Sequence, residues 1–405
     1  MTIGRTLPPA AAPVCLRDLG YGIRGILRPG SEASAREEEV RRYFGVNHVF
    51  LVSSGTAALT LTLLALKTLS RKTDVVIPAY TCFSVPAAVL KAGLRPVLCD
   101  ITLPTFDYDY AQLERSLSEN TLCVVAHHLF GIASDIDRIK ALCHPRAIVV
   151  LEDAAQAMGG QSDDRLLGTR GDVGIFSLGR GKNITCGSGG IIVTSSDRIA
   201  AAIEPMYRRL ANSSVVETLK DLAQIALMAV FIRPRLYWIP ARLPFLKLGQ
   251  TIFPKTISMK RLSGFKAGLL HRWKDRLRVS DRFRAKAAAH FGGQLAIPLP
   301  PGPPRPYLRL PIFAPTPDAK QRLCASSQGR RLGLSAAYPT PVSDIPQIRS
   351  ITRGEHFPIA QTVASTMVTL PTHHWVSERD REDIVDLVSR FTNTPGEAVV
   401  WRRAS

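Results

Sequence analysis

Residues 171–190 read Gly-Asp-Val-Gly-Ile-Phe-Ser-Leu-Gly-Arg-Gly-Lys-Asn-Ile-Thr-Cys-Gly-Ser-Gly-Gly and place Lys182 between glycines. Upstream, residues 147–153 read Ala-Ile-Val-Val-Leu-Glu-Asp, an apolar run that predicts a buried strand ending at Asp153. Open α/β sheets bind ligands at the carboxyl ends of their strands. Glycines let the backbone pass close to a bulky group, and a lysine held deprotonated in a cramped site can form a Schiff base. The pattern therefore predicts a covalent cofactor site at Lys182.

Pyridoxal phosphate (PLP) is the cofactor that these residue types favour. Asp153 could pair with a protonated pyridine nitrogen, and Gln156, three residues later, could donate to a ring oxygen. Ser177 could bind the phosphate. Gly55 and Thr56 open an apolar stretch that is typical of a helix, whose first N–H groups would face an anion. A single lysine is most often a solvated loop residue, so the assignment depends on these features occurring together.

Other cofactors lack a signature in this chain. The GSGG at 187–190 does not have dinucleotide-binding spacing, and no GxxxxGK[ST] motif occurs. The pairs His127-His128 and His373-His374 are adjacent, and neighbours on a strand point to opposite faces, so no metal site is predicted. The seven cysteines form no CxxC pair and favour a reducing, cytoplasmic location.

Several short segments resemble the DegT/StrS family of PLP-dependent sugar aminotransferases. They are Ser53–Leu59, Ile77–Thr81, His128–Gly131, Glu152–Gln156, Phe176-Ser with Lys182-Asn, and Leu370–Trp375, so the resemblance runs from about residue 20 to 390. It implies that Lys182 carries the Schiff base and moves a proton, and that Asp153 faces the pyridine nitrogen. Gln156 would contact the ring hydroxyl, and the phosphate would be held by Ser177, Gly55 and Thr56.

The resemblance also implies an activity. We expect a homodimeric aminotransferase that moves an amino group, with glutamate as the expected donor, to a nucleotide-linked keto-sugar in polysaccharide, glycolipid or secondary-metabolite biosynthesis. Dehydratases of the family carry a histidine at the lysine position, and this chain keeps Lys182. Two alternatives stay open: a PLP-dependent sugar dehydratase or epimerase, and a non-catalytic protein of the same fold.

Three positions depart from the family pattern. Cys82 stands where an aromatic residue usually stacks on the cofactor ring, so Tyr80, Phe83 or the thiol itself would cover that face. Ser188 replaces a common glutamate. Met259-Lys-Arg261 stands where the family shows Asn-x-Arg, which supplies a phosphate contact from the neighbouring subunit. For His128, a structural hydrogen bond and a place near the cofactor are both open.

The strand pattern predicts an α/β protein of PLP fold type I. Short β-branched runs at 75–77, 96–98, 123–126, 148–151 and 190–194 alternate with helix-like stretches, which indicates a mostly parallel sheet covered on both faces. We expect a flexible lead over 1–19, a large PLP-binding domain over 20–255 and a smaller C-terminal α/β domain over 256–405.

Positive charge is concentrated in one region of the chain. The chain has 52 basic and 33 acidic residues, a net charge of +19, and residues 201–290 alone hold 18 basic and 5 acidic residues. Within them, about 221–254 form a basic, apolar insertion whose run at 222–232 is too short to span a bilayer. It would either dock on the inner face of the membrane or pack in the dimer. No nucleic-acid reader motif accompanies the charge, so specific nucleic-acid binding is not expected.

Overall fold

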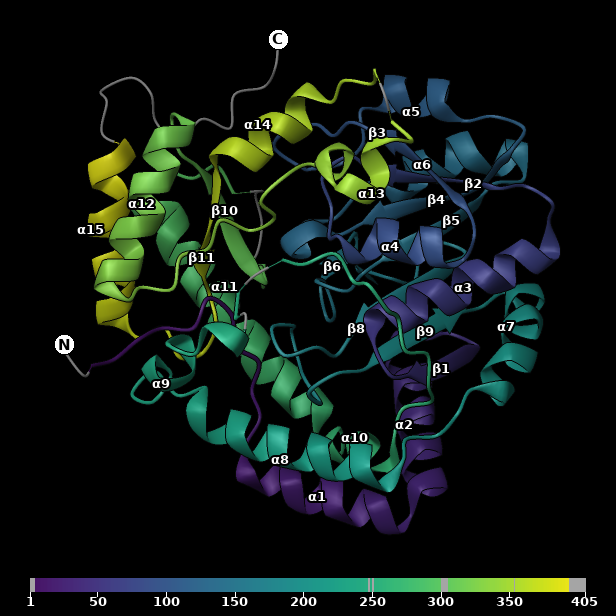
Figure 1. Cartoon of the computed structure of the whole chain (residues 1–405), viewed down its shortest axis with the longest axis horizontal. Helices are drawn as coiled ribbons and strands as arrows, with labels where there is room; N and C mark the ends of the chain where they lie inside the picture. Colours follow the sequence, from purple (N-terminus) through teal and green to yellow (C-terminus); the bar gives the residue numbers. More distant parts are fainter. Residues whose placement is uncertain (1–3, 247, 250, 300–304, 353, 393–405) are drawn as a thin grey trace.

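A seven-stranded sheet forms the centre of the larger part of the molecule (Figure 1). The computed structural model describes residues 4–246, 248–249, 251–299, 305–352 and 354–392. The strand order is β1-β9-β8-β5-β4-β2-β3, and the strands from β3 to β8 run parallel, whereas β9 is antiparallel to both β8 and β1. The predicted α/β architecture with a mostly parallel sheet is confirmed. The strands are β1 (His48–Val52), β2 (Asp74–Pro78), β3 (Arg95–Cys99), β4 (Thr121–His127), β5 (Val149–Asp153), β8 (Val173–Ser177) and β9 (Gly190–Thr194).

Alternating side chains bury both faces of this sheet. Val75 and Ile77 pack toward α3 and α4, whereas Val76 between them packs toward α5 and α6. Further helices complete the larger part, and the short hairpin β6 (Gln161–Ser162) and β7 (Arg165–Leu166) follows β5. These helices are α1 (Leu16–Leu27), α2 (Pro29–Phe44), α3 (Gly55–Leu69), α4 (Ser84–Lys91), α5 (Tyr110–Ser116), α6 (Ile136–Cys143), α7 (Asp197–Arg209), α8 (Val215–Phe231), α9 (Trp238–Ala241) and α10 (Gly264–Leu269).

A second, smaller sheet pairs β10 (Arg309–Phe313) with β11 (Met367–Pro371) in antiparallel register. Its core is shared with three long helices, and in Figure 1 α12 and α15 lie together at the edge away from the large sheet. The helices of this part are α11 (Trp273–Gln294), α12 (Pro317–Arg330), α13 (Pro346–Arg349), α14 (Pro358–Thr366) and α15 (Glu378–Thr392). The domain boundary at 255/256 stays a prediction.

A flexible lead was expected at the start of the sequence. From residue 4 onward, however, this segment packs against the rest of the protein. Leu7, Ala11 and Ala12 are buried, and the apolar Leu7 side chain joins the core around β10 and α11. His373 Nε2 lies 2.8 Å from the carbonyl oxygen of Pro8, and Arg284 Nη2 donates to that of Ala11 (3.0 Å). The prediction of flexibility rested on the prolines and alanines of this segment. It did not take into account that small residues allow the backbone to lie close against other elements.

Glycines set the position of α1. A Cβ on Gly25 would lie 2.1 Å from the carbonyl oxygen of Gly264, and one on Gly268 would lie 2.2 Å from that of Tyr21. Helices α1 and α10 therefore touch backbone to backbone, which only glycine permits. None of the helices in the described part of the chain is both long and apolar enough to cross a bilayer.

Candidate active site

Lys182 lies in the loop between β8 and β9, at the carboxyl ends of the parallel strands. It lines a cavity of about 140 Å³ together with the other five residues predicted for the site, which are Gly55, Thr56, Asp153, Gln156 and Ser177. Burial lowers the pKa of Lys182 below its ordinary value, although charge at Cys82 and Asp153 acts in the opposite direction. A neutral amine is therefore available at a lower pH than on a solvated lysine. Such an amine can attack a carbonyl carbon.

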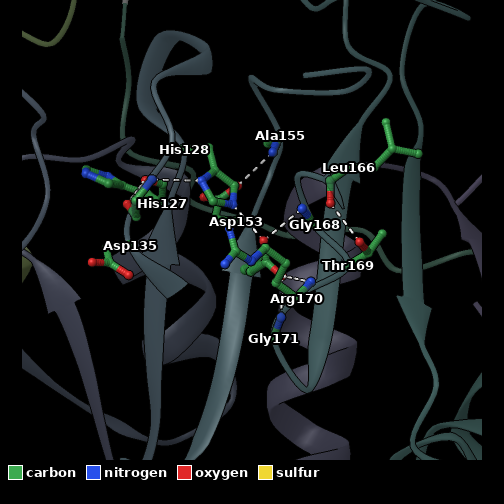
Figure 2. Close-up of polar contacts among 12 residues, drawn as sticks. His127, His128, Asp135, Asp153, Ala155, Leu166, Gly168, Thr169, Arg170 and Gly171 are labelled. Atoms are coloured by element: carbon green, nitrogen blue, oxygen red, sulfur yellow. Dashed lines mark hydrogen bonds and ion pairs between the residues drawn. The ribbon is translucent and has the colours of Figure 1, made fainter. Parts of the chain in front are cut away.

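Asp153 ends β5 and enters the same cavity. Its Oδ1 accepts a hydrogen bond from the backbone N–H of Ala155 (3.0 Å), which fixes the carboxylate at the strand end (Figure 2). The carboxylate can thus hold a cation, such as a protonated ring nitrogen, across the cavity from the lysine loop.

Gly55 and Thr56 open α3, whose N-cap is Ser54. The Ser54 hydroxyl accepts from the backbone N–H of Ala57 (3.0 Å), which leaves the N–H groups of the first helical turn for a ligand. A Cβ on Gly55 would lie 2.8 Å from Cβ of Ser177, so only glycine lets the helix start approach that hydroxyl so closely. The helix N-terminus and the Ser177 hydroxyl together form a cradle of donors that fits a phosphate. The residues present therefore fit PLP.

Gln156 is held by two partners. Its Nε2 donates to the Tyr338 hydroxyl (2.7 Å), and its Oε1 accepts from the backbone N–H of Phe130 (3.2 Å). Tyr338 comes from the smaller part of the molecule, and burial raises its pKa, so the phenol stays protonated. The predicted contact of Gln156 with a ring hydroxyl stays a prediction.

Among the candidates for the ring face, Cys82 is the one that lines the cavity. Its Sγ donates to the Ser84 hydroxyl (3.4 Å). Phe83 instead stacks on Tyr338 with 6.4 Å between ring centroids, and Tyr80 donates its hydroxyl to the Tyr338 carbonyl oxygen (3.2 Å). The two aromatic residues thus support Tyr338, and the thiol occupies the position beside the cavity.

His128 combines both of the roles left open for it, since it lines the cavity and is hydrogen bonded. The backbone N–H of Ser134 donates to Nδ1 (3.2 Å), so Nδ1 carries no proton and Nε2–H donates to Glu152 (2.7 Å). Glu152 is fully buried and also accepts from the backbone N–H groups of Gly168 (2.8 Å), Arg170 (2.5 Å) and Gly171. In Figure 2, His128 lies near Asp153, with Gly168, Arg170 and Gly171 on the neighbouring loop.

Ser188 and Lys260, which belong to the remaining departures from the family pattern, line a second cavity of about 320 Å³ that also reaches Ser53 and Thr56. The Ser188 hydroxyl accepts from Lys266 Nζ (2.9 Å), and Lys260 Nζ pairs with Glu217 (2.6 Å). The Arg261 guanidinium lies over the Tyr207 ring at 5.2 Å. A phosphate contact from Lys260 or Arg261 to a second subunit stays a prediction.

Sequence reasoning missed Arg309 at the start of β10. Its positive charge helps to lower the pKa of Lys182, which places the guanidinium near the lysine. The two residues are far apart in the chain, and an isolated arginine in a strand carries no local motif. The β10–β11 pairing, which brings Arg309 to the site, could not be read from the sequence.

An α/β fold of PLP type I, with a half-buried lysine, a carboxylate and a phosphate cradle around one cavity, is the class that these observations define. Residues 23–221 match the model of the DegT/DnrJ/EryC1/StrS aminotransferase family. The chain is 32% identical over 180 residues to the GDP-perosamine synthase of Vibrio cholerae, and this match covers 44% of this chain and 48% of that protein. It is 34% identical over 190 residues to a UDP-N-acetyl-3-dehydro-alpha-D-glucosamine 3-aminotransferase of Acidithiobacillus ferrooxidans, covering 47% and 50%. The chain thus spans about half the length of these curated relatives.

The fold likeness extends over nearly the whole chain. PseC of Helicobacter pylori, an aminotransferase of pseudoaminic acid biosynthesis, superposes with a TM-score of 0.76 at 16% identity, over 96% of this chain and 99% of that one. The sugar aminotransferase CalS13 of Micromonospora echinospora gives 0.74 at 20% identity, over 95% and 99%. The smaller part of the molecule therefore shares the fold of these proteins as well.

Proposed function

We propose that the protein is a PLP-dependent aminotransferase that moves an amino group from an amino acid, with glutamate as the expected donor, to a keto-sugar on an anionic carrier. The observation that carries this proposal is the half-buried Lys182, whose pKa is lowered, in one cavity with Asp153 and the phosphate cradle. When bound, PLP acts as an electron sink and a temporary acceptor of the amino group. The names of the curated relatives support a nucleotide, such as GDP or UDP, as one such carrier.

Each site residue has a task in this proposal. Lys182 Nζ, as a neutral amine, would hold the cofactor and would take and return the proton at the substrate carbon. Asp153 would pair with the protonated pyridine nitrogen. The first turn of α3 and the Ser177 hydroxyl would hold the phosphate, and Tyr338 orients Gln156 at the cavity wall.

The test is the visible spectrum of the purified protein with added PLP. We expect an absorbance band of bound PLP that glutamate bleaches as the amino group moves to the cofactor. A band that no amino donor changes would favour the dehydratase or epimerase alternative. Absence of any band after PLP addition would favour the non-catalytic alternative and contradict the proposal.

We further propose that α1 and α8 contact a membrane surface, in an assembly that is expected to be a homodimer. The two helices lie side by side (Figure 1), and α1 presents Leu16 (56% exposed) and Leu27 (79% exposed) beside basic residues. Val216 and Leu227 of α8 are exposed as well. Apolar side chains among arginines and lysines suit the interface of an anionic bilayer. The proposed surface thus includes α1 in addition to the predicted membrane segment, about 221–254.

A vesicle experiment tests this contact. The double variant Leu16→Glu, Leu27→Glu is expected to reduce co-sedimentation with vesicles of one third anionic phospholipid at low salt by roughly tenfold or more, because it removes apolar burial and adds repulsion. The matched control is Ile351→Glu, an exposed residue near α13 and away from α1 in Figure 1. Equal binding by both variants, or none by the unaltered protein, would argue for a packed subunit interface instead.

A further inference from the structure

A large apolar cavity of about 870 Å³ adjoins the Lys182 loop. Helix α8 contributes Ala223, Leu227 and Phe231 to its lining, which also includes Ile239 and Leu243. The volume is that of a ligand site rather than a packing defect. Most lining side chains are hydrocarbon, so the cavity can take up a hydrocarbon chain and remove it from water.

Three positively charged side chains, Arg180, Lys220 and Arg309, also line this cavity. Within the described residues, none of the three forms a salt bridge, and the hydrogen bond found for them runs from Arg309 Nη1 to the Ser335 hydroxyl (3.3 Å). Arg180 and Lys220 are exposed, as solvated cations usually are, but Arg309 is half-buried. A half-buried guanidinium without a carboxylate partner fits an anionic ligand.

Two of these side chains, Arg180 and Arg309, lie on the side of the cavity that meets the active site. Arg180 and Gly181 directly precede Lys182 in the chain, and the charge of Arg309 acts on that lysine. An anion held there would place its attached group toward Lys182. Its other substituent would lie in the apolar part of the cavity.

The apolar part continues to an open rim. Leu243, Leu246 and Leu248 line the cavity and are 38%, 41% and 37% exposed. A long chain could therefore leave the cavity over apolar side chains. A nucleoside suits the site less well, because its base and ribose need several polar partners, and among the uncharged lining side chains Gln224 and Tyr237 supply them.

We propose that this cavity binds the hydrocarbon chain of a lipid phosphate or diphosphate, and that this lipid is the carrier of the keto-sugar. The proposal rests on the proposed aminotransferase function and names its substrate class. The phosphate lies at Arg180 and Arg309, the sugar reaches Lys182, and the chain extends past Leu227 toward the rim. A carrier of this kind resides in a membrane, which agrees with the apolar residues exposed on α1 and α8.

The experiment is calorimetric titration of the PLP-loaded protein with dodecyl phosphate, below its micelle concentration, with UDP and with inorganic pyrophosphate. Dodecyl phosphate is expected to bind at least tenfold more tightly than either, and shortening its chain is expected to weaken binding by roughly fourfold per methylene group. Tighter binding of UDP, with no dependence on chain length, would overturn the proposal in favour of a nucleotide carrier.

Two variants on one helix locate the binding site. Ala223→Trp fills the cavity and is expected to weaken dodecyl phosphate binding at least tenfold. Leu219→Trp is the matched control, because Leu219 lies one turn earlier on α8, is exposed and does not line the cavity. Equal affinities in the two variants would overturn the assignment, as would a second copy of the chain found covering the cavity.

The visible spectrum separates a substrate carrier from a membrane lipid held elsewhere. Dodecyl phosphate bound at Arg309 is expected to shift the absorbance of the PLP-loaded protein, because its charge lies near Lys182. Binding without any shift would overturn the carrier proposal. The glutamate reaction, measured in the same samples, reports on the aminotransferase function separately: if glutamate bleaches the band and dodecyl phosphate does not bind, the inference fails while the function stands.

Discussion

Replacement of Lys182 by alanine is expected to lower the rate of amino transfer by at least about a thousandfold, because no other group could take over both the attachment of PLP and the proton transfer. Lys182→Arg is expected to be equally inactive, since a guanidinium stays protonated and cannot act as a nucleophile. The measurement is single-turnover bleaching of the PLP band by glutamate, followed at the same protein and cofactor concentrations for each variant.

The control for this loss is Lys91→Ala at the end of α4, where the side chain is exposed. This variant truncates a lysine that does not line the cavity, and it is expected to keep the unaltered rate. A Lys182→Ala protein that retained a tenth of the activity would assign the proton transfer to another residue, and His128 would be the first to test because it lines the cavity.

Glu152→Ala is expected to destabilise the protein by about 3–5 kcal/mol, which is the range for removing one partner from a buried charged network. The carboxylate is fully buried and accepts from His128 and three backbone N–H groups, which would all lose their partner. Urea unfolding followed by circular dichroism measures the difference. Glu114→Ala is the control, because that glutamate is exposed and its change is expected to stay within about 0.5 kcal/mol.

The loss of stability in Glu152→Ala is expected to depend on pH, and the pKa of Glu152 determines in which direction. Burial by itself raises the pKa of Glu152, but His128 and the N–H groups of Gly168 and Gly171 hold it below its ordinary value of 4.5 overall. A carboxylate with a lowered pKa in the folded state stabilises the protein above its unfolded pKa, and this contribution is lost as the pH falls further. The difference between the unaltered protein and Glu152→Ala should therefore shrink below about pH 4.5. A constant difference down to pH 3 would contradict this origin.

Local patterns predicted the strands and the lysine loop well. The apolar runs at 75–77, 123–126 and 148–151 became β2, β4 and β5, because each run was long enough to fill a buried strand and was bounded by turn residues. Parallel strands share one carboxyl edge, so residues that end such strands, such as Asp153 and Ser177, meet there whatever the loops between them do.

Contacts across the two sheets could not be predicted in the same way. Tyr338 reaches Gln156 from a loop in the smaller part of the molecule, and Arg309 arrives through the pairing of β10 with β11. Neither position has a periodic or spaced signal, because its place depends on how separate elements pack. The burial of Leu7 depended on the same kind of packing and was missed for the same reason.

The position of the lead has a consequence for the timing of synthesis. Pro8 makes its contact with His373, 365 residues further along the chain, and Arg5 pairs with Asp380. At typical elongation rates of about 5–20 residues per second, the partners of these residues leave the ribosome on the order of tens of seconds after them. Throughout that interval Leu7 has no core to enter, so this segment is a candidate for chaperone binding on the nascent chain. The last step of folding would then be the packing of residues 5–8 against His373 and Asp380.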